Sequence, residues 1–231
     1  MSDYNLYAYW RSSCSARLRI ALNIKGISYD NITVNLLKDE QLSAEHRALN
    51  PSCSVPLLVR KKPVDATTTT TTTPFKIGQS VAALEYLDEV HPEAPLLPPS
   101  SDPEARAVVR TLVNIVACDI QPVTNLRIMR RVRSLGGNAE EWNRELIVDG
   151  LRAYEDVIAG GCAGRYSYGD DVTMADVCLL PGVWNAKRFG VEVAGQFPTI
   201  AKVTENLEQL RAVQDAFYVN QPDAPEEMRA K

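Results

Sequence analysis

Three small polar residues that could hold or supply a reactive sulfur stand together near the start of the sequence. They are Ser12, Ser13 and Cys14, preceded by Arg11, and they fall where a short aromatic strand gives way to a helical pattern. The first N–H groups of a helix lack intrahelical partners, and the helix dipole is positive at this end. The segment therefore favours an anion, and a thiolate is such an anion.

Two chemical roles are open for this segment from residue type alone. Cys14 could be a nucleophile, because a helix N-terminus favours the thiolate, or the serine hydroxyls could donate hydrogen bonds to the thiolate of a cofactor. A purely structural role fits equally well, with Ser12 and Ser13 capping the helix and Cys14 as a small buried side chain. This segment alone does not decide between these roles, so the rest of the sequence is needed.

Two further pairs of residues point to a peptide ligand. If the Val55–Pro56 bond is cis, the backbone N–H and C=O of Val55 are exposed to pair with an extended peptide, although most X–Pro bonds are trans. Gln79 and Ser80 open a predicted helix, where a serine can hold a carboxylate or act as an ordinary N-cap. A thiol, a peptide backbone and a free α-carboxylate occur together in glutathione, which the three features in this order predict as the ligand.

The elements that must position these residues alternate between strand and helix. The strands predicted from alternating or apolar runs cover residues 6–9, 29–34, 55–59 and 76–77. The predicted helices run from Ser13 or Ser15 to Lys25, from 42 to 49, and from behind Ser80 to about 91. In the first helix Arg17, Arg19 and Lys25 are expected to form the polar positions.

A change in composition divides the chain into two domains. Residues 92–102 are rich in proline and serine and predict a linker, and beyond them the apolar residues follow helical spacing only. We therefore expect an α/β domain over residues 1–91 and an all-helical domain over residues 103–231. The tract Thr67–Thr73 predicts a tolerated loop at a hairpin tip.

Composition narrows the possible partners and compartments. With 25 basic and 29 acidic residues and no basic stripe, nucleic acid is an unexpected partner. No apolar stretch approaches the roughly 20 residues of a membrane-spanning helix, and the start lacks a signal-like pattern. Five cysteines without a CxxC pair predict reduced thiols and a cytoplasmic protein, and two histidines leave almost no material for a metal site.

The segment Ser12–Leu22 has the sequence SSCSARLRIAL, which resembles the signature SSCSxR(V/L)RIAL of the zeta class of glutathione transferases. The resemblance covers nearly the whole chain. Other segments that carry it are Lys25–Ile27, Leu49–Pro51, Val55–Pro56, Ile77–Ser80, Glu85–Leu87, Ile120–Pro122 and Val172–Asp176. It implies the glutathione transferase fold, with an α/β thioredoxin-like N-terminal domain and an all-α C-terminal domain, and it implies a homodimer.

The same resemblance assigns roles to individual residues. Ser12, Ser13 and Cys14 would be catalytic, with the Ser12 hydroxyl stabilising the glutathione thiolate. Arg11 and Arg188 would bind substrate carboxylates, since guanidinium groups suit carboxylates. The implied glutathione-binding residues are Gln41, Val55, Pro56, Gln79, Ser80, Gln121 and Asn125.

Two positions and one segment qualify the resemblance. Ala16 departs from the family, which usually has tryptophan or histidine there, and Arg127 stands where zeta members often carry a small polar residue. The segment Thr173–Asp176 matches the family but is a capping box, so we expect it to be structural.

The function implied by the resemblance is isomerisation of maleylacetoacetate to fumarylacetoacetate in phenylalanine and tyrosine breakdown. Thiolate addition, bond rotation and elimination would regenerate glutathione, so the partners would be glutathione and a small dicarboxylate. The alternatives are a broader glutathione transferase or α-haloacid dehalogenase, a cysteine-centred thiol transferase, and a non-catalytic binding module. A thioredoxin-type oxidoreductase is disfavoured because Cys14 has no CxxC partner.

Overall fold

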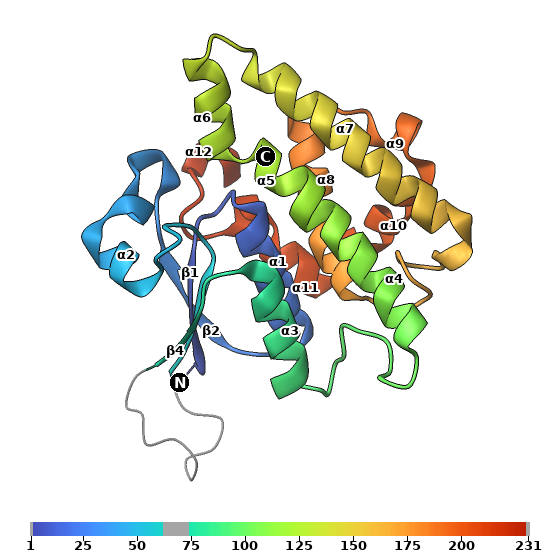
Figure 1. The fold of residues 1–231 in the computed structure, drawn as a ribbon. Coiled ribbons are helices and arrows are strands. Elements are labelled where there is room, and N and C mark those ends of the chain that lie inside the picture. Colours follow the sequence, from blue (N-terminus) through green and yellow to red (C-terminus); the bar gives the residue numbers. More distant parts are fainter. Residues whose placement is uncertain (1, 62–73, 230–231) are drawn as a thin grey trace. The chain divides into compact units, whose positions relative to one another are not determined.

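The computed structural model describes residues 2–61 and 74–229, and the predicted Thr67–Thr73 loop lies outside this range. The chain forms two compact units, one of Met1–Pro95 with Arg211–Lys231 and the other of Leu96–Leu210 (Figure 1). The helical domain was expected to extend to residue 231, but the helical unit ends at Leu210. Helix α11 (Arg211–Ala216) belongs to the first unit because it packs against α1 (Ser13–Ile24).

The first unit is built on a mixed sheet of four strands in the order β2-β1-β3-β4. β1 pairs in parallel with β2, whereas β3 pairs antiparallel with both β1 and β4. A parallel pair needs a crossover connection, and α1 supplies it between β1 and β2. The strands are β1 (Tyr4–Ala8), β2 (Tyr29–Thr33), β3 (Leu57–Arg60) and β4 (Phe75–Ile77).

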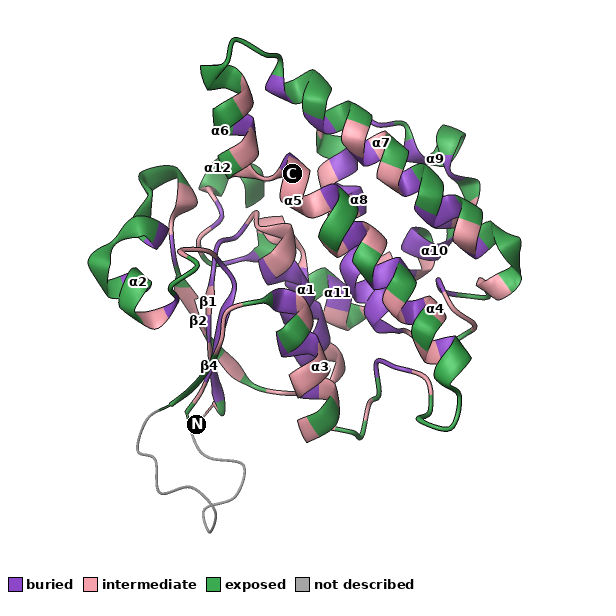
Figure 2. Ribbon diagram, viewed as in Figure 1, coloured by how far each residue is buried: buried purple, intermediate pink, exposed green. Residues whose placement is uncertain are grey.

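Helix α1 is buried on nearly every side, as its purple ribbon shows (Figure 2). Arg17 and Arg19, expected at polar positions, are 2% and 0% exposed. The Lys25 side chain is also buried, and its Nζ donates to Asp88 Oδ1 and to the carbonyl oxygens of His91 and Ala94 at 2.9, 2.8 and 2.7 Å. Buried cations need such partners, so these residues join α1 to other segments of the unit.

The remaining helices of the first unit lie after β2, after β4 and after α11 in the chain. The predicted helix over residues 42–49 is interrupted at Ser43, whose side chain accepts the N–H of His46 at 3.1 Å and so begins a new helix there. These elements are the 3₁₀ helices Leu36–Lys38, Glu40–Leu42 and Tyr218–Asn220, and α2 (Ala44–Leu49), α3 (Ser80–Val90) and α12 (Glu226–Arg229).

Apart from one isolated bridge between Ala163 and Gly169, the regular structure described in the second unit is helical. The capping box expected at Thr173–Asp176 is present at the start of α8. The helices are α4 (Pro103–Asn114), α5 (Gln121–Thr124), α6 (Leu126–Ser134), α7 (Ala139–Val157), α8 (Met174–Arg188), α9 (Val193–Gln196) and α10 (Pro198–Glu208), with π-helical turns at Ile115–Ile120 and Ile158–Cys162.

One helical stretch, Pro103–Ser134, is long and apolar enough to cross a membrane by length and composition alone. This corrects the expectation that no such stretch exists. The finding is weak evidence for a membrane span, because core helices of globular proteins pass the same test. Within this stretch Val109, Leu112 and Val116 are buried among the residues of the helical unit.

Helix α7 closely approaches the π-helical turn Ile115–Ile120 at Gly150. A Cβ atom placed on Gly150 would lie 2.2 Å from Cγ1 of Ile120, a side chain that is 5% exposed. Gly150→Ala gains helix propensity, yet the overlap forces a shift in a packed core. We expect a net loss of about 1–2 kcal/mol in the free energy of unfolding, measured by urea denaturation.

The matched control is Gly195→Ala, because nothing lies within 4 Å of a Cβ at that position in α9. It should leave the stability unchanged or slightly raised. Ile120→Ala removes the atom that clashes, so the cost of Gly150→Ala should nearly vanish in that background. Equal costs in both backgrounds would contradict this account of Gly150.

Candidate active site

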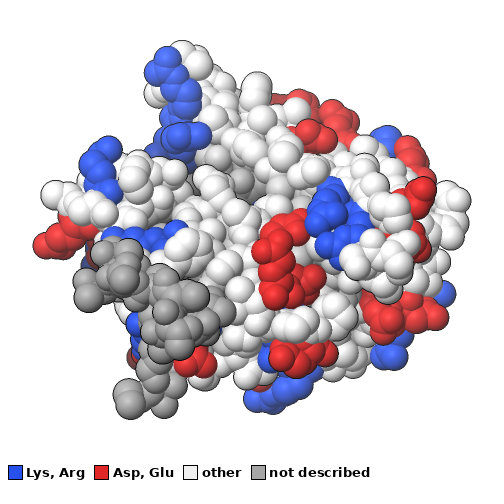
Figure 3. Space-filling view, turned by 60° about the horizontal axis from the view of Figure 1, so that its bottom comes forward, with Lys and Arg blue, Asp and Glu red and all other residues white. Residues whose placement is uncertain are grey.

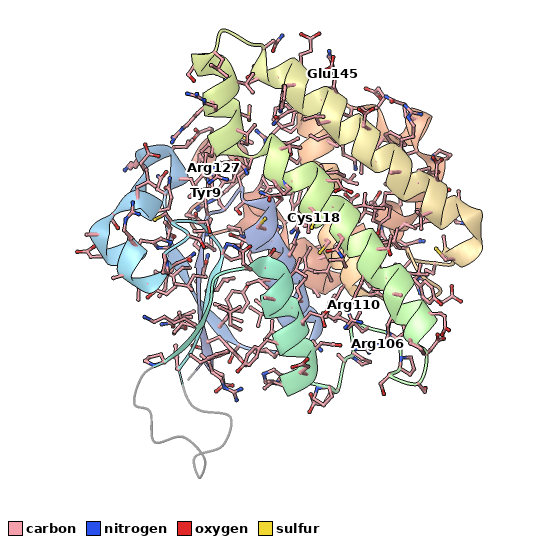
Figure 4. The ribbon with its side chains drawn as sticks, in the orientation of Figure 1. Tyr9, Arg106, Arg110, Cys118, Arg127 and Glu145 are labelled. Carbon is pink, nitrogen blue, oxygen red and sulfur yellow. The ribbon has the colours of Figure 1, made fainter. Side chains whose placement is uncertain are left out.

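The predicted catalytic corner is a tight turn between β1 and α1. Ser12 donates its N–H to the carbonyl oxygen of Tyr9 at 3.0 Å, and Tyr9 is labelled at this position in Figure 4. As the N-cap of α1, Ser12 also accepts the N–H of Ser15 on its Oγ at 3.1 Å. Because a hydroxyl accepts through its lone pairs, its hydrogen is left to donate to a ligand.

The first turn of α1 adds backbone donors to this hydroxyl. Ser13 and Cys14 begin the helix, their side chains are half-buried, and no acceptor for their N–H groups is recorded among the residues described. In a helix of 12 residues these groups lie at the positive end of the dipole. The corner can therefore hold an anion such as a thiolate, as the sequence predicts.

The start of α3 is tied to α1 by a buried guanidinium group. Arg17 donates from Nη1 to the Oγ of Ser80 at 3.1 Å, and both side chains are buried. The N-cap of α3 is Gln79, without a side-chain bond, so the expected N-cap role of Ser80 is wrong and Ser80 is the first helical residue. Arg17 was not predicted as a site residue, although an arginine inside an apolar helix was a signal.

The Val55–Pro56 bond is cis, as the peptide-pairing hypothesis requires. The residues before it are fixed through the carbonyl oxygen of Ser54. This oxygen accepts from Asn50 Nδ2 at 2.9 Å and lies 3.0 Å from His46 Nε2.

Two further predicted glutathione ligands belong to the same unit. Val55 packs with Tyr9 and Trp10 in one buried cluster, which brings it beside the catalytic corner. Gln41 is 9% exposed and donates from Nε2 to Asp39 at 3.2 Å. Its Oε1 is buried and accepts no hydrogen bond from the residues described, so it is available to a donor on a ligand.

A second buried arginine, Arg19, was also missed from the sequence. It donates from Nη2 to the carbonyl oxygen of Trp10 at 3.0 Å, and at longer range from Nη1 to that of Tyr9 at 3.5 Å and from Nε to that of Ala216 at 3.3 Å. Burial lowers the pKa of Arg19 to about 10, which leaves the guanidinium protonated at neutral pH. A cation therefore lies directly behind the turn that carries Ser12.

Arg11, a predicted substrate ligand, is half-buried beside the corner. Its guanidinium carbon lies 5.2 Å from the centroid of the Trp10 ring, within the range of a cation–π contact. This contact orients the side chain without using its hydrogen-bond donors.

The other predicted ligands belong to the helical unit. Asn125 is the N-cap of α6, accepting from Ile128 at 3.1 Å and donating to the carbonyl oxygen of Pro122 at 2.9 Å, and Gln121 is half-buried at the start of α5. Arg127 is exposed on α6, where Figure 4 labels it. It lines a shallow depression of about 520 Å³ that includes neither Gln121 nor Asn125.

Arg188 is exposed at the C-terminal end of α8. It donates to Asn185 Oδ1, and its guanidinium carbon lies 4.6 Å from the centroid of the Phe189 ring. Both contacts restrict the side chain before any substrate binds, which suits a carboxylate ligand. Over the described part of the chain, no three His, Cys, Asp or Glu side chains gather as a metal site would need.

A thioredoxin-like sheet with an anion-holding helix N-terminus, followed by a helical unit, defines the glutathione transferases. The family model "Glutathione S-transferase, N-terminal domain" matches residues 11–90. A maleylacetoacetate isomerase of Aspergillus fumigatus is 57% identical over 97% of this chain and 94% of its own length. The chain belongs to the zeta class of glutathione transferases, the class of the maleylacetoacetate isomerases.

Solved structures agree with this assignment. The zeta-class maleylpyruvate isomerase, in its holo form, is 38% identical with a TM-score of 0.84, over 96% of this chain and 100% of that one. A maleylacetoacetate isomerase of Anaeromyxobacter dehalogenans is 38% identical with a TM-score of 0.85, over 98% and 96% of the two chains. It contains dicarboxyethyl glutathione and citrate in its active site. The predicted fold and class are confirmed.

Proposed function

We propose that the protein catalyses the glutathione-dependent cis–trans isomerisation of maleylacetoacetate to fumarylacetoacetate. The observation that carries the proposal is the Ser12 corner, which combines a free hydroxyl hydrogen with the unpaired N–H groups of Ser13 and Cys14. The high identity to a maleylacetoacetate isomerase supports the choice of substrate.

The residues of the first unit fit glutathione. The corner can bind the thiolate of glutathione. Val55 can pair with its peptide backbone, and the start of α3 can bind its γ-glutamyl carboxylate. The buried, unpaired Oε1 of Gln41 requires a donor, and a peptide ligand offers N–H groups. When bound, glutathione supplies a thiolate that adds to the cis double bond, permits rotation and leaves as the trans double bond forms.

The side chains of the protein have three tasks in this reaction. Ser12 donates a hydrogen bond that keeps the sulfur ionised, and the α1 N-terminus adds its dipole. Arg188 and Arg11 bind the carboxylates of the dianionic substrate. Because these groups orient the substrate and stabilise its charge, most of the rate gain comes from positioning and electrostatics.

The direct test is an isomerase assay on the purified protein with and without glutathione. We expect turnover of maleylacetoacetate only when glutathione is present, and glutathione should be recovered unchanged. Absence of turnover, or stoichiometric loss of glutathione, would overturn the proposal. Calorimetry with glutathione alone separates an inactive binding module from a chain that does not bind it.

A second candidate substrate is maleylpyruvate, because a zeta-class structure 38% identical to this chain is a maleylpyruvate isomerase. Both substrates are cis-configured and carry a carboxylate beside the reacting double bond. Comparison of kcat/KM for the two in one assay ranks them. An α-haloacid, assayed for halide release, tests the broader transferase alternative.

Arg188→Ala tests the substrate contact. We expect the KM for the substrate to rise by about 10- to 100-fold, because a charged hydrogen bond contributes about 1.5–3 kcal/mol, while glutathione affinity stays unchanged. The matched control is Lys187→Ala, since Lys187 is also an exposed cation of α8 and pairs with Glu208 at 3.5 Å. Equal KM values for both variants would exclude Arg188 as a carboxylate ligand.

We further propose a cytoplasmic homodimer that acts in phenylalanine and tyrosine breakdown. All five cysteines are free, which suits a reducing compartment, and the family resemblance supports the dimer and the pathway. Light scattering should give twice the mass of the chain, and fractionation should find the protein with cytoplasmic markers. Basic and acidic side chains share the face seen in Figure 3, and the absence of nucleic-acid and membrane partners stays a prediction.

A further inference from the structure

We propose that Asp223, near the C-terminal end of the chain, is a positioning residue for the catalytic corner. It fixes the turn Tyr9–Ser12 and through it the hydroxyl of Ser12. The inference rests on the proposed function of Ser12, because a fixed hydroxyl matters only if it serves the thiolate. Figure 1 shows the red C-terminal segment beside the blue start of the same unit.

The N–H of Trp10 is a backbone donor that the turn itself does not use. The N–H of Ser12 closes the turn by donating to the carbonyl oxygen of Tyr9 at 3.0 Å. Asp223 accepts the Trp10 N–H on Oδ2 at 2.8 Å. Hydrogen bonds to a carboxylate are about twice as strong as neutral ones, so this contact restrains Trp10 firmly.

The carbonyl side of the turn is held by Arg19. Its guanidinium donates to the oxygens of Trp10 and Tyr9, so Asp223 and Arg19 together hold both the N–H and the C=O of Trp10. The negative charge of Asp223 also favours the protonated form of Arg19, against the burial that lowers its pKa to about 10. The two side chains act as a pair of opposite charges around the turn.

The C-terminal segment is itself fixed so that it presents Asp223. Gln221 is 5% exposed and donates from Nε2 to the carbonyl oxygens of Asp215 and Phe217, each at 2.9 Å. Ala224 is 3% exposed and packs in the cluster that contains Trp10. Asp223 is therefore held between two buried neighbours.

One atom of Asp223 is not explained by a packing role. Its Oδ1 is buried and accepts no hydrogen bond from the residues described. An unpaired buried carboxylate oxygen costs stability, so its presence calls for a functional reason. The cost is tolerated because the other oxygen of the same carboxylate, Oδ2, holds the Trp10 N–H, and a misplacement of about 1 Å at a reacting group can cost about a hundredfold in rate.

The test compares Asp223→Ala with Asp223→Asn. Both variants lack the charge, but the asparagine oxygen can still accept the Trp10 N–H. We expect Asp223→Ala to have a kcat/KM at least about tenfold below that of Asp223→Asn, and a pKa of the bound glutathione thiol about one unit higher. Glu227→Gln removes an exposed charge from the same segment and should match the wild type.

Amide hydrogen exchange at Trp10 provides a readout that does not need glutathione. The Trp10 N–H should exchange faster in Asp223→Ala than in Asp223→Asn. Equal kcat/KM and equal thiol pKa in the two variants would overturn the inference while the proposed function stands. A wild type that neither binds glutathione nor isomerises the substrate would instead overturn the proposed function, and with it the role of Asp223 in catalysis.

Discussion

Replacing Ser12 by alanine is expected to lower kcat/KM for the isomerisation by a factor of about 10²–10³. Loss of one preorganised donor at a site of developing negative charge has this order of effect. The Ser12 hydroxyl accepts the N–H of Ser15 through a lone pair, so its hydrogen can donate to the thiolate. The substitution removes this donor. The pKa of the bound glutathione thiol should rise, so the acidic limb of the pH–rate profile should move to higher pH.

The same substitution also removes an N-cap, which costs about 1 kcal/mol of stability. Ser43→Ala is the matched control, because Ser43 caps α2 by accepting the N–H of His46 at 3.1 Å and has no catalytic role. It should lose stability and keep full activity, and Ser12→Thr should retain most of both. If Ser12→Ala stays active and Cys14→Ala does not, cysteine chemistry replaces the serine mechanism.

The largest loss of stability is expected for Asp176→Ala, at about 3–5 kcal/mol in the free energy of unfolding. Asp176 is fully buried and accepts the N–H groups of Ser167 and Thr173, each at 2.8 Å, and the Thr173 hydroxyl at 3.0 Å. The alanine variant leaves these three donors unpaired in the core, at about 1–3 kcal/mol each. Urea denaturation measures the loss.

Asp176→Asn is the matched variant for this prediction. It keeps one acceptor oxygen, so its loss should be smaller than that of Asp176→Ala. Burial raises the pKa of Asp176 despite its hydrogen bonds, so the native state binds the proton more tightly than the unfolded state. The stability that proton binding by Asp176 contributes is fully present below the pKa of the unfolded state and is lost as the pH rises through the pKa of the folded state. Asp176→Asn should remove that pH dependence; a pH profile identical to the wild type would contradict this assignment.

Much of the fold was predictable because it depends on local patterns. Alternating and helical periodicity located the four strands of the sheet and α1, and the capping box at Thr173 marked the start of α8. Ser43 was missed as a helix start because a single N-cap inside a helical pattern gives little signal. The start of α3 was misplaced by one residue because Ser80 resembles an N-cap by residue type, whereas it is the first residue of the helix.

The candidate site was predictable only where its residues are adjacent in the sequence. Ser12, Ser13 and Cys14 form one segment, so the corner was evident. Periodicity marks Arg17 and Arg19 only as polar positions, and their burial depends on acceptors that come from distant segments. The same limit explains why Asp223 was missed, since nothing near it in the sequence indicates a bond to Trp10.

The division of the chain also has a consequence for its synthesis. The helical unit is continuous, whereas the first unit needs both the N-terminal strands and the residues from Arg211 onward. During translation the helical unit can fold as soon as it leaves the ribosome, but the Trp10 turn must wait for Asp223, which is translated after the whole helical unit. The Ser12 corner is therefore translated before the helical unit but completed after it, so a chain terminated before Asp223 is expected to lose activity even when the helical unit has folded.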